Sequence, residues 1–167
     1  MNKFNIKVEI YVSKFGVNLY FCFMKILIVN GPNLNWLGRR EPEIYGTESF
    51  EDILEELKTA FPQTEILHVQ SNVEGEIINE LQKAEDDSSI SGIILNAAAY
   101  THTSIAIADT LKSMKTNVIL VHLSNIYNRE TERHTDLLLA NADGCILGLG
   151  KKSYFAASYL LNLKLID

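Results

Sequence analysis

Short apolar segments alternate with longer amphipathic ones from residue 24 to near the end of the chain, and this alternation constrains the fold most strongly. Five of the apolar segments have the length and composition of buried strands: Lys25–Asn30, Thr64–Gln70, Ile90–Asn96, Asn117–His122 and Gly144–Gly148. Strands that alternate with helices usually form parallel sheets, because each helix returns the chain to the same end of the sheet. We therefore expect an α/β fold, a three-layer sandwich in which helices cover both faces of a five-stranded parallel sheet.

Four amphipathic stretches in the same region predict helices. The first follows Ser49, a good N-cap, and carries apolar side chains at helical spacing. Asn72 is expected to cap the second helix. The third and fourth helices are expected at about Thr103–Lys115 and Ser153–Leu163.

The chain of 167 residues is long enough for one domain with its own core, which we place at residues 24–167. Residues 1–23 differ from the rest because aromatic side chains are concentrated there. They contain neither a signal-peptide cleavage site nor an apolar run that could span a membrane. We interpret them as an N-terminal extension, with Met24 as the hypothetical natural start.

The overall charge and the cysteines limit the possible partners. A net charge of −6 argues against nucleic acid or an anionic membrane as the main partner. Cys22 and Cys145 are spaced neither as a pair nor as metal ligands, which indicates reduced thiols in a cytoplasmic protein. A flavin- or nucleotide-binding domain is a weaker alternative, because Gly31-Pro32-Asn33 is too poor in glycine for a phosphate-binding turn.

Polar side chains stand where the apolar segments end. The first segment leads into residues 30–33, the second ends at Gln70 to Asn72, the third at Asn96 and the fourth at His122. Open parallel sheets bind ligands beyond the carboxyl ends of their strands. Any one of these residues could simply begin a loop, but four coincident ends indicate a polar crevice.

The connection after the first strand is longer than most connections in compact domains, and it contains Arg39, Arg40 and Tyr45. A tyrosine has a pKa near 10, and a neighbouring guanidinium lowers such a pKa by roughly 1–3, so the pair can supply a phenolate base. This combination predicts an enzyme with a loop that closes over its substrate.

Four motifs resemble the signature of the type II 3-dehydroquinate dehydratases: N-G-P-N-L-N-W-L-G-R-R-E-P-E-I-Y-G (30–46), Q-S-N-V-E-G-E (70–76), L-N-A-A-A-Y-T-H-T-S (95–104) and V-H-L-S-N-I-Y-N-R-E (121–130). The resemblance implies a flavodoxin-like fold, no metal or cofactor, and a dodecamer built from trimers. It also implies a lyase of the shikimate pathway of aromatic amino acid biosynthesis, which removes water from 3-dehydroquinate through an enolate to give 3-dehydroshikimate.

The resemblance assigns catalytic roles to residues in these motifs. Tyr45 matches the base that removes the C2 proton beside the ketone, and Arg40 matches the arginine that activates it. His122 matches the general acid that protonates the departing C1 hydroxyl. Asn33 and Asn96 fit as holders of a water molecule that stabilises the enolate.

The same resemblance assigns substrate-binding roles. His102 and Arg133 match residues that hold the substrate's hydroxyl groups. The backbone amides of Leu123 and Ser124, with the Ser124 hydroxyl, match the cradle for its carboxylate. Asp109 matches a residue that reaches the site of a neighbouring subunit in the trimer.

Several residues depart from the family pattern, and three of them bear on whether the chain is an active enzyme. Leu120 stands where Glu is usual, two residues before His122 on the same strand face. A carboxylate there would orient the histidine, so Leu120→Glu is expected to raise the rate unless another carboxylate fills the gap. Ala98 replaces a common Gly, at a position that suits a positive φ, and Asp136 adds a charge that would repel a carboxylate substrate. These departures support the alternative of a catalytically impaired or non-catalytic relative that retains the fold and the oligomer.

Overall fold

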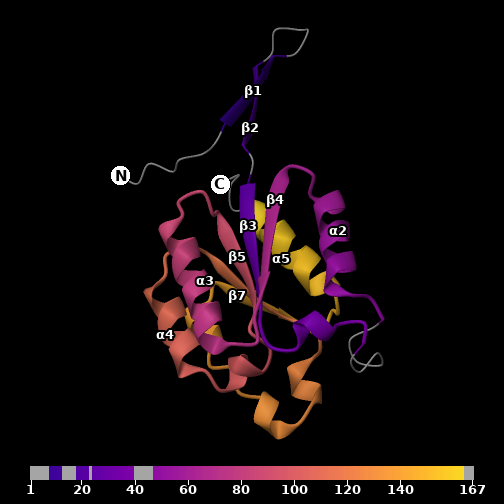
Figure 1. Cartoon of the computed structure of the whole chain (residues 1–167), viewed down its shortest axis with the longest axis vertical. Coiled ribbons are helices and arrows are strands. Elements are labelled where there is room, and N and C mark those ends of the chain that lie inside the picture. The colour runs from indigo at the N-terminus through magenta and orange to yellow at the C-terminus, as the bar shows by residue number, and fades with distance from the viewer. Residues whose placement is uncertain (1–7, 13–17, 23, 40–46, 164–167) are drawn as a thin grey trace.

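A five-stranded parallel sheet forms the centre of the molecule in the computed structural model, which describes residues 8–12, 18–22, 24–39 and 47–163 (Figure 1). Its strands are β3 (Met24–Asn30), β4 (Thr64–Gln70), β5 (Gly92–Asn96), β6 (Val118–His122) and β7 (Gly144–Leu147). They lie in the order β4-β3-β5-β6-β7, which is the flavodoxin-like order 2-1-3-4-5. The predicted α/β fold is therefore confirmed.

Helices cover both faces of this sheet, as Figure 1 shows. They are α2 (Phe50–Ala60), α3 (Glu74–Asp86), α4 (Ile105–Ser113) and α5 (Lys152–Leu163). Buried side chains of α2 and α5 form one apolar cluster with the sheet, and those of α3 and α4 form a second cluster on the other face. Among the described residues, no helix combines the length and the apolar character that crossing a bilayer requires.

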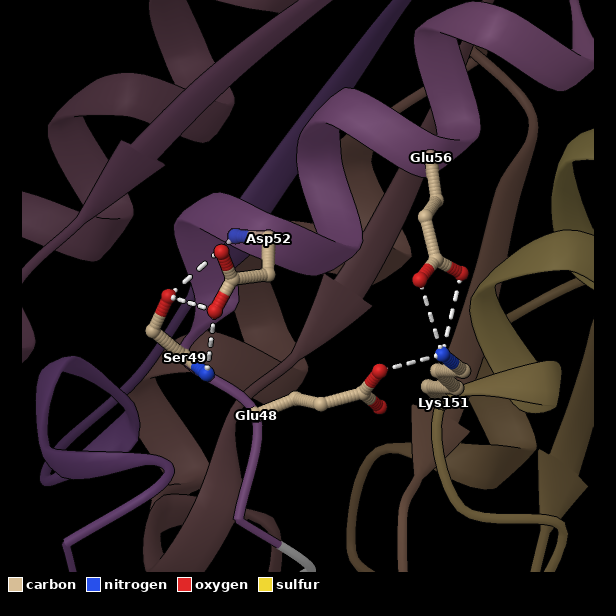
Figure 2. A network of polar contacts seen from close by, with 5 residues as sticks. All are labelled: Glu48, Ser49, Asp52, Glu56 and Lys151. Carbon is tan, nitrogen blue, oxygen red and sulfur yellow. Dashed lines mark hydrogen bonds and ion pairs between the residues drawn. The ribbon is translucent and has the colours of Figure 1, made fainter.

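The predicted N-cap of α2 is confirmed, and its surroundings link two distant segments (Figure 2). Ser49 and Asp52 form a capping box, in which each side chain accepts a hydrogen bond from the other residue's backbone N–H. Beside it, Nζ of Lys151 lies 2.7 Å from Glu48 and 3.0 Å from Glu56. The residues that lead into α2 are thus held against the start of α5.

The predicted cap of α3 is wrong. The N-cap residue is Val73, and no side chain caps the helix there. Oδ1 of Asn72 instead accepts hydrogen bonds from the backbone N–H of Asn33 at 2.9 Å and from the Gln70 side chain at 3.1 Å. These bonds connect the ends of β3 and β4, so a tertiary contact replaces the expected local one.

An antiparallel hairpin lies within the N-terminal extension. Strands β1 (Val8–Val12) and β2 (Asn18–Cys22) pair with Val8 opposite Cys22. Figure 1 shows this hairpin beyond the amino end of β3, away from the large sheet. That residues 24–167 are a single domain with Met24 as its natural start stays a prediction.

The register of the sheet brings its carboxyl ends together. Asn30, the last residue of β3, pairs with Gln70 of β4 and with Asn96 of β5. The chain then passes so close to the neighbouring turn that a Cβ on Gly31 would lie 2.6 Å from the backbone oxygen of Ala97. Glycine is required here because of this approach, and the result is a shared edge from which loops rise around a pocket.

Candidate active site

A pocket of about 190 Å³ opens at the carboxyl ends of the strands. Seven residues with sequence-predicted roles line it: Asn33, Asn96, His102, His122, Leu123, Ser124 and Arg133. They come from three parts of the chain, at or after the ends of β3, β5 and β6, so only the folded sheet brings them together. The predicted polar crevice is therefore confirmed for the ends of β3, β5 and β6, whereas the residues from Gln70 to Asn72 after β4 do not line it.

One described residue with a predicted role, Asp109, does not line this pocket. Asp109 is exposed on α4, where it lines a separate groove between α3 and α4. Arg40 and Tyr45 lie outside the described residues. Their predicted roles as activating arginine and base, and that of Asp109 toward a neighbouring subunit, stay predictions.

His122 is the last residue of β6 and is only 6% exposed. Its Nε2 lies 3.4 Å from Oδ2 of Asp136, whose side chain is 4% exposed. Leu120 lies on the same face of β6 as His122, but its side chain is packed in the apolar cluster beneath α3 and α4. The carboxylate beside the histidine thus comes from the loop after β6 instead of from the strand itself. Asp136 faces the imidazole and does not line the pocket.

His102 lies on the 3₁₀ helix η2 (Ala98–His102) and has a defined hydrogen-bond partner. Its Nδ1 lies 2.7 Å from the backbone oxygen of Thr135, which can only accept, so Nδ1 carries a proton. In the neutral ring, Nε2 is then an acceptor. The ring stacks on that of His122, with centroids 6.3 Å apart.

Asn96 belongs to a buried polar network below the pocket. Its Nδ2 donates to the Tyr154 hydroxyl at 2.9 Å, and that hydroxyl donates to Oδ1 of Asn30 at 2.7 Å. Asn30 in turn contacts Nε2 of His68 at 3.2 Å. Burial raises the pKa of Tyr154, so its phenol stays protonated, and the network fixes the Asn96 amide from below.

Two residues beside the pocket have left-handed backbone conformations. Asn33 has φ of 67° and Ala98 has φ of 50°. Asparagine tolerates this region, but alanine is strained there because of its Cβ. The expectation that residue 98 suits a positive φ is confirmed.

Two arginines add positive charge to the pocket. Arg133 has a predicted role, whereas Arg129 received none from the sequence. Nε of Arg133 lies 2.9 Å from Oε2 of Glu130, and Nε of Arg129 lies 3.5 Å from the same oxygen. The signal that could have identified Arg129 is its place in the fourth motif, after a strand that ends in a site residue.

One group of side chains near the pocket has donor atoms that suit a metal ion. Atoms of His122, Asp136 and Cys145 lie within 4.8 Å of one another, and such nitrogen, oxygen and sulfur donors fit Zn²⁺. Burial, followed by the Asp136 carboxylate, raises the pKa of the Cys145 thiol to about 11. The sulfur is therefore a protonated thiol at neutral pH, which is a weak ligand.

The fold and the pocket together define a class of protein. A small pocket rich in imidazole, amide and guanidinium groups, at the carboxyl end of a parallel sheet, is typical of an α/β enzyme that acts on a small polar molecule. Residues 24–162 match the sequence pattern of the family described as Dehydroquinase class II. The chain belongs to this family, so the predicted resemblance is confirmed.

Individual relatives agree with the family match. A 3-dehydroquinate dehydratase from an Exiguobacterium species is 48% identical over 139 residues, which cover 83% of this chain and 94% of the relative. One from Idiomarina loihiensis is 49% identical over 132 residues, covering 78% and 86%. The crystal structure of the type II dehydroquinase from Butyrivibrio crossotus has a TM-score of 0.81 at 42% identity, covering 84% of this chain and 98% of that one.

Proposed function

We propose that the protein is a type II 3-dehydroquinate dehydratase, a hydro-lyase that converts 3-dehydroquinate into 3-dehydroshikimate and water in the shikimate pathway. The observation that carries this proposal is the pocket, because it gathers seven residues to which the sequence assigns a role in this one reaction. The names of the relatives support the same substrate.

In the proposed mechanism, the Tyr45 phenolate removes a proton from C2, beside the C3 ketone. The electron pair enters the ketone and forms an enolate, which Asn33 and Asn96 stabilise through a bound water. Collapse of the enolate breaks the C1–O bond, and His122 gives its proton to the departing hydroxyl, which leaves as water. Arg40 favours the phenolate form of Tyr45 electrostatically.

The remaining pocket residues bind the substrate. Nε2 of His102 accepts a hydrogen bond from a substrate hydroxyl, which is consistent with the proton on its Nδ1. Arg133 binds a second hydroxyl, and the backbone amides of Leu123 and Ser124 bind the carboxylate. The loop that carries these amides is held by Gly150, whose N–H donates to the Leu123 oxygen at 2.9 Å.

A catalytically impaired relative is the second candidate, and one observation favours it. Ala98 occupies a strained backbone position beside Asn96 and lines the pocket. A shift of the turn by a fraction of an ångström could misplace the Asn96 amide. The absence of a carboxylate at Leu120 argues less strongly for this candidate, since Asp136 lies beside His122.

The deciding experiment adds 3-dehydroquinate to the purified protein and follows the ultraviolet absorbance of the conjugated product. We expect turnover by the natural chain and none by Tyr45→Phe, which keeps the ring but cannot form a phenolate. Circular dichroism and size-exclusion chromatography should show that this variant is folded. Product formation by Tyr45→Phe at near the natural rate would remove Tyr45 from the mechanism.

We also propose that the chain is cytoplasmic and assembles as a dodecamer of trimers in which Asp109 reaches a partner's site. The exposure of Asp109 on α4, outside its own pocket, is consistent with this role. Size-exclusion chromatography with light scattering should give twelve times the mass of 18.8 kDa. A monomeric mass would contradict the assembly without excluding catalysis.

A further inference from the structure

The contact between His122 and Asp136 joins the end of strand β6 to the loop that follows it, 14 residues further along the chain. His122 ends a central strand of the sheet, whereas Asp136 lies in the loop between β6 and β7, just before the 3₁₀ helix η5 (Leu139–Asn141). Both side chains are nearly inaccessible to solvent, and Nε2 lies 3.4 Å from Oδ2. In such a dry environment a carboxylate needs hydrogen-bond donors to compensate for its lost hydration.

The backbone fixes the Asp136 carboxylate in place. Its Oδ1 accepts hydrogen bonds from the N–H groups of Leu138 at 2.9 Å and Leu139 at 3.0 Å. Leu138 is fully buried in the apolar cluster of the α3 and α4 face, so the turn that donates these bonds is itself anchored. With one oxygen bound to the turn, the other oxygen is directed at the imidazole.

The other neighbours of the ring are poorer candidates for this role. Cys145 contributes a protonated thiol, and His102 contributes a stacked ring whose Nδ1 is already bonded to Thr135. Leu120, two residues earlier on the same face of β6, is aliphatic and cannot form a hydrogen bond. Among the described residues around the ring, Asp136 is therefore the one that can accept a hydrogen bond from a protonated nitrogen of His122.

We propose that Asp136 is a positioning residue that fixes the orientation and the tautomer of His122. The carboxylate accepts a hydrogen bond from Nε2–H, since an ionised carboxylate can only accept, so the proton stays on Nε2. Nδ1 is then the ring nitrogen that exchanges a proton with the substrate. This inference rests on the proposed function in that it gives His122 the role of general acid. The contact itself can be measured whether or not the protein is an enzyme.

The test compares Asp136→Asn with Asp136→Ser. Asparagine keeps an oxygen for the Leu138 and Leu139 N–H groups but presents an NH₂ group to Nε2. Because an NH₂ group can only donate, Nε2 must accept, and the ring proton is then on Nδ1. Serine keeps an acceptor for the turn and presents neither a carboxylate nor an amide. Asp143→Asn is the matched control, because Asp143 also accepts a backbone N–H, from Val118 at 2.7 Å, at the start of β7.

Solid-state ¹⁵N NMR of histidine-labelled protein reports which ring nitrogen carries the proton, with a His122→Asn sample to assign the signal. We expect the Nε2–H form in the natural chain and in Asp143→Asn, and the Nδ1–H form in Asp136→Asn. An unchanged His122 tautomer in Asp136→Asn would overturn the inference, whatever the activity of the protein.

Steady-state kinetics supply the second measurement. We expect kcat of Asp136→Asn to fall by roughly 10–100-fold, a typical loss for a residue that orients a functional histidine, with a much smaller change in KM. Asp136→Ser should lose less, and Asp143→Asn should be close to the natural chain. Equal kcat values for Asp136→Asn and the natural chain would refute the positioning role, whereas inactivity of the natural chain would refute only the proposed function.

Discussion

Ala98 occupies a backbone conformation that costs alanine roughly 1–2 kcal/mol relative to glycine. We expect Ala98→Gly to raise the free energy of unfolding by about 0.5–1 kcal/mol, because part of the relieved strain is offset by the lost methyl group and the freer unfolded chain. Urea denaturation measures the change.

Ala99, the next residue in η2, is the control for this prediction. Its φ is not positive, so Ala99→Gly carries the same entropic cost without relief of strain, and we expect it to lower stability by about 0.5–1 kcal/mol. If both substitutions lower stability equally, Ala98 is not strained. If Ala98→Gly also increases kcat, the strained turn limits the enzyme, as the impaired-relative alternative requires.

The environment of His68 leads us to expect that the free energy of unfolding depends on pH in a specific way. Desolvation lowers its pKa from the usual value of 6.5, because the ring is partly buried against Phe50 and beside Asn30. The unfolded chain therefore binds a proton at higher pH than the folded chain does. The contribution of neutral His68 to the free energy of unfolding is fully present above about pH 6.5. It is lost as the pH falls through the folded-state pKa of His68.

His68→Gln should remove this part of the pH dependence, since glutamine can still accept a hydrogen bond but does not titrate in this range. Denaturant unfolding of both proteins from neutral to mildly acidic pH measures the difference. The same slope in both proteins would show that another group is responsible.

At the scale of the elements, the stability of helix α2 depends on the capping box in its first turn. We expect Ser49→Ala to destabilise the protein by about 1 kcal/mol, because it removes the acceptor for the Asp52 N–H and breaks the capping box (Figure 2). Urea unfolding measures the loss. Thr59→Ala in the last turn of the same helix should have little effect, because its hydroxyl only bonds back to the Glu55 oxygen.

The strands and their polar ends could be predicted from local sequence, because buried parallel strands are short aliphatic runs. The predicted and observed limits of β4 coincide, Thr64–Gln70. The order of the strands could not be predicted from the same pattern, since each segment is equally apolar and the order depends on which crossovers pack. The predicted cap of α3 was wrong for a related reason, because tertiary contacts decided the outcome. Asn72 binds the backbone of Asn33, 39 residues away.

The candidate site could be predicted residue by residue where the chain resembles the family. His122 and Asn96 stand in motifs and line the pocket as expected. The role of Asp136 could not be predicted, because its proximity to His122 depends on the path of the loop between β6 and β7. For the same reason, the sequence-based expectation of a faster Leu120→Glu variant loses its basis. His122 already has a carboxylate beside it, and the new one would be buried among apolar side chains at a cost in stability.

At the scale of the whole molecule, the proposed assembly divides one site between two subunits. His122 and Arg133 line the pocket of their own subunit, while Asp109 lies on a different surface of the same chain. If Asp109 acts in a partner's site, a substitution of Asp109 inactivates the site of the neighbouring subunit. A substitution of His122 inactivates the site of its own subunit. Subunit mixing can therefore separate a shared site from one complete within each chain.

We expect Asp109→Ala and His122→Asn each to be nearly inactive alone and to regain activity when they are unfolded and refolded together. In a random one-to-one mixture, about one quarter of the sites combine an intact His122 with a partner's intact Asp109. The control mixes His122→Asn with Arg133→Ala, because both residues belong to the same pocket and no combination restores a complete site. Recovery in the first mixture and none in the second would establish the shared site, whereas no recovery in the first would place Asp109 outside the catalytic machinery of its neighbours.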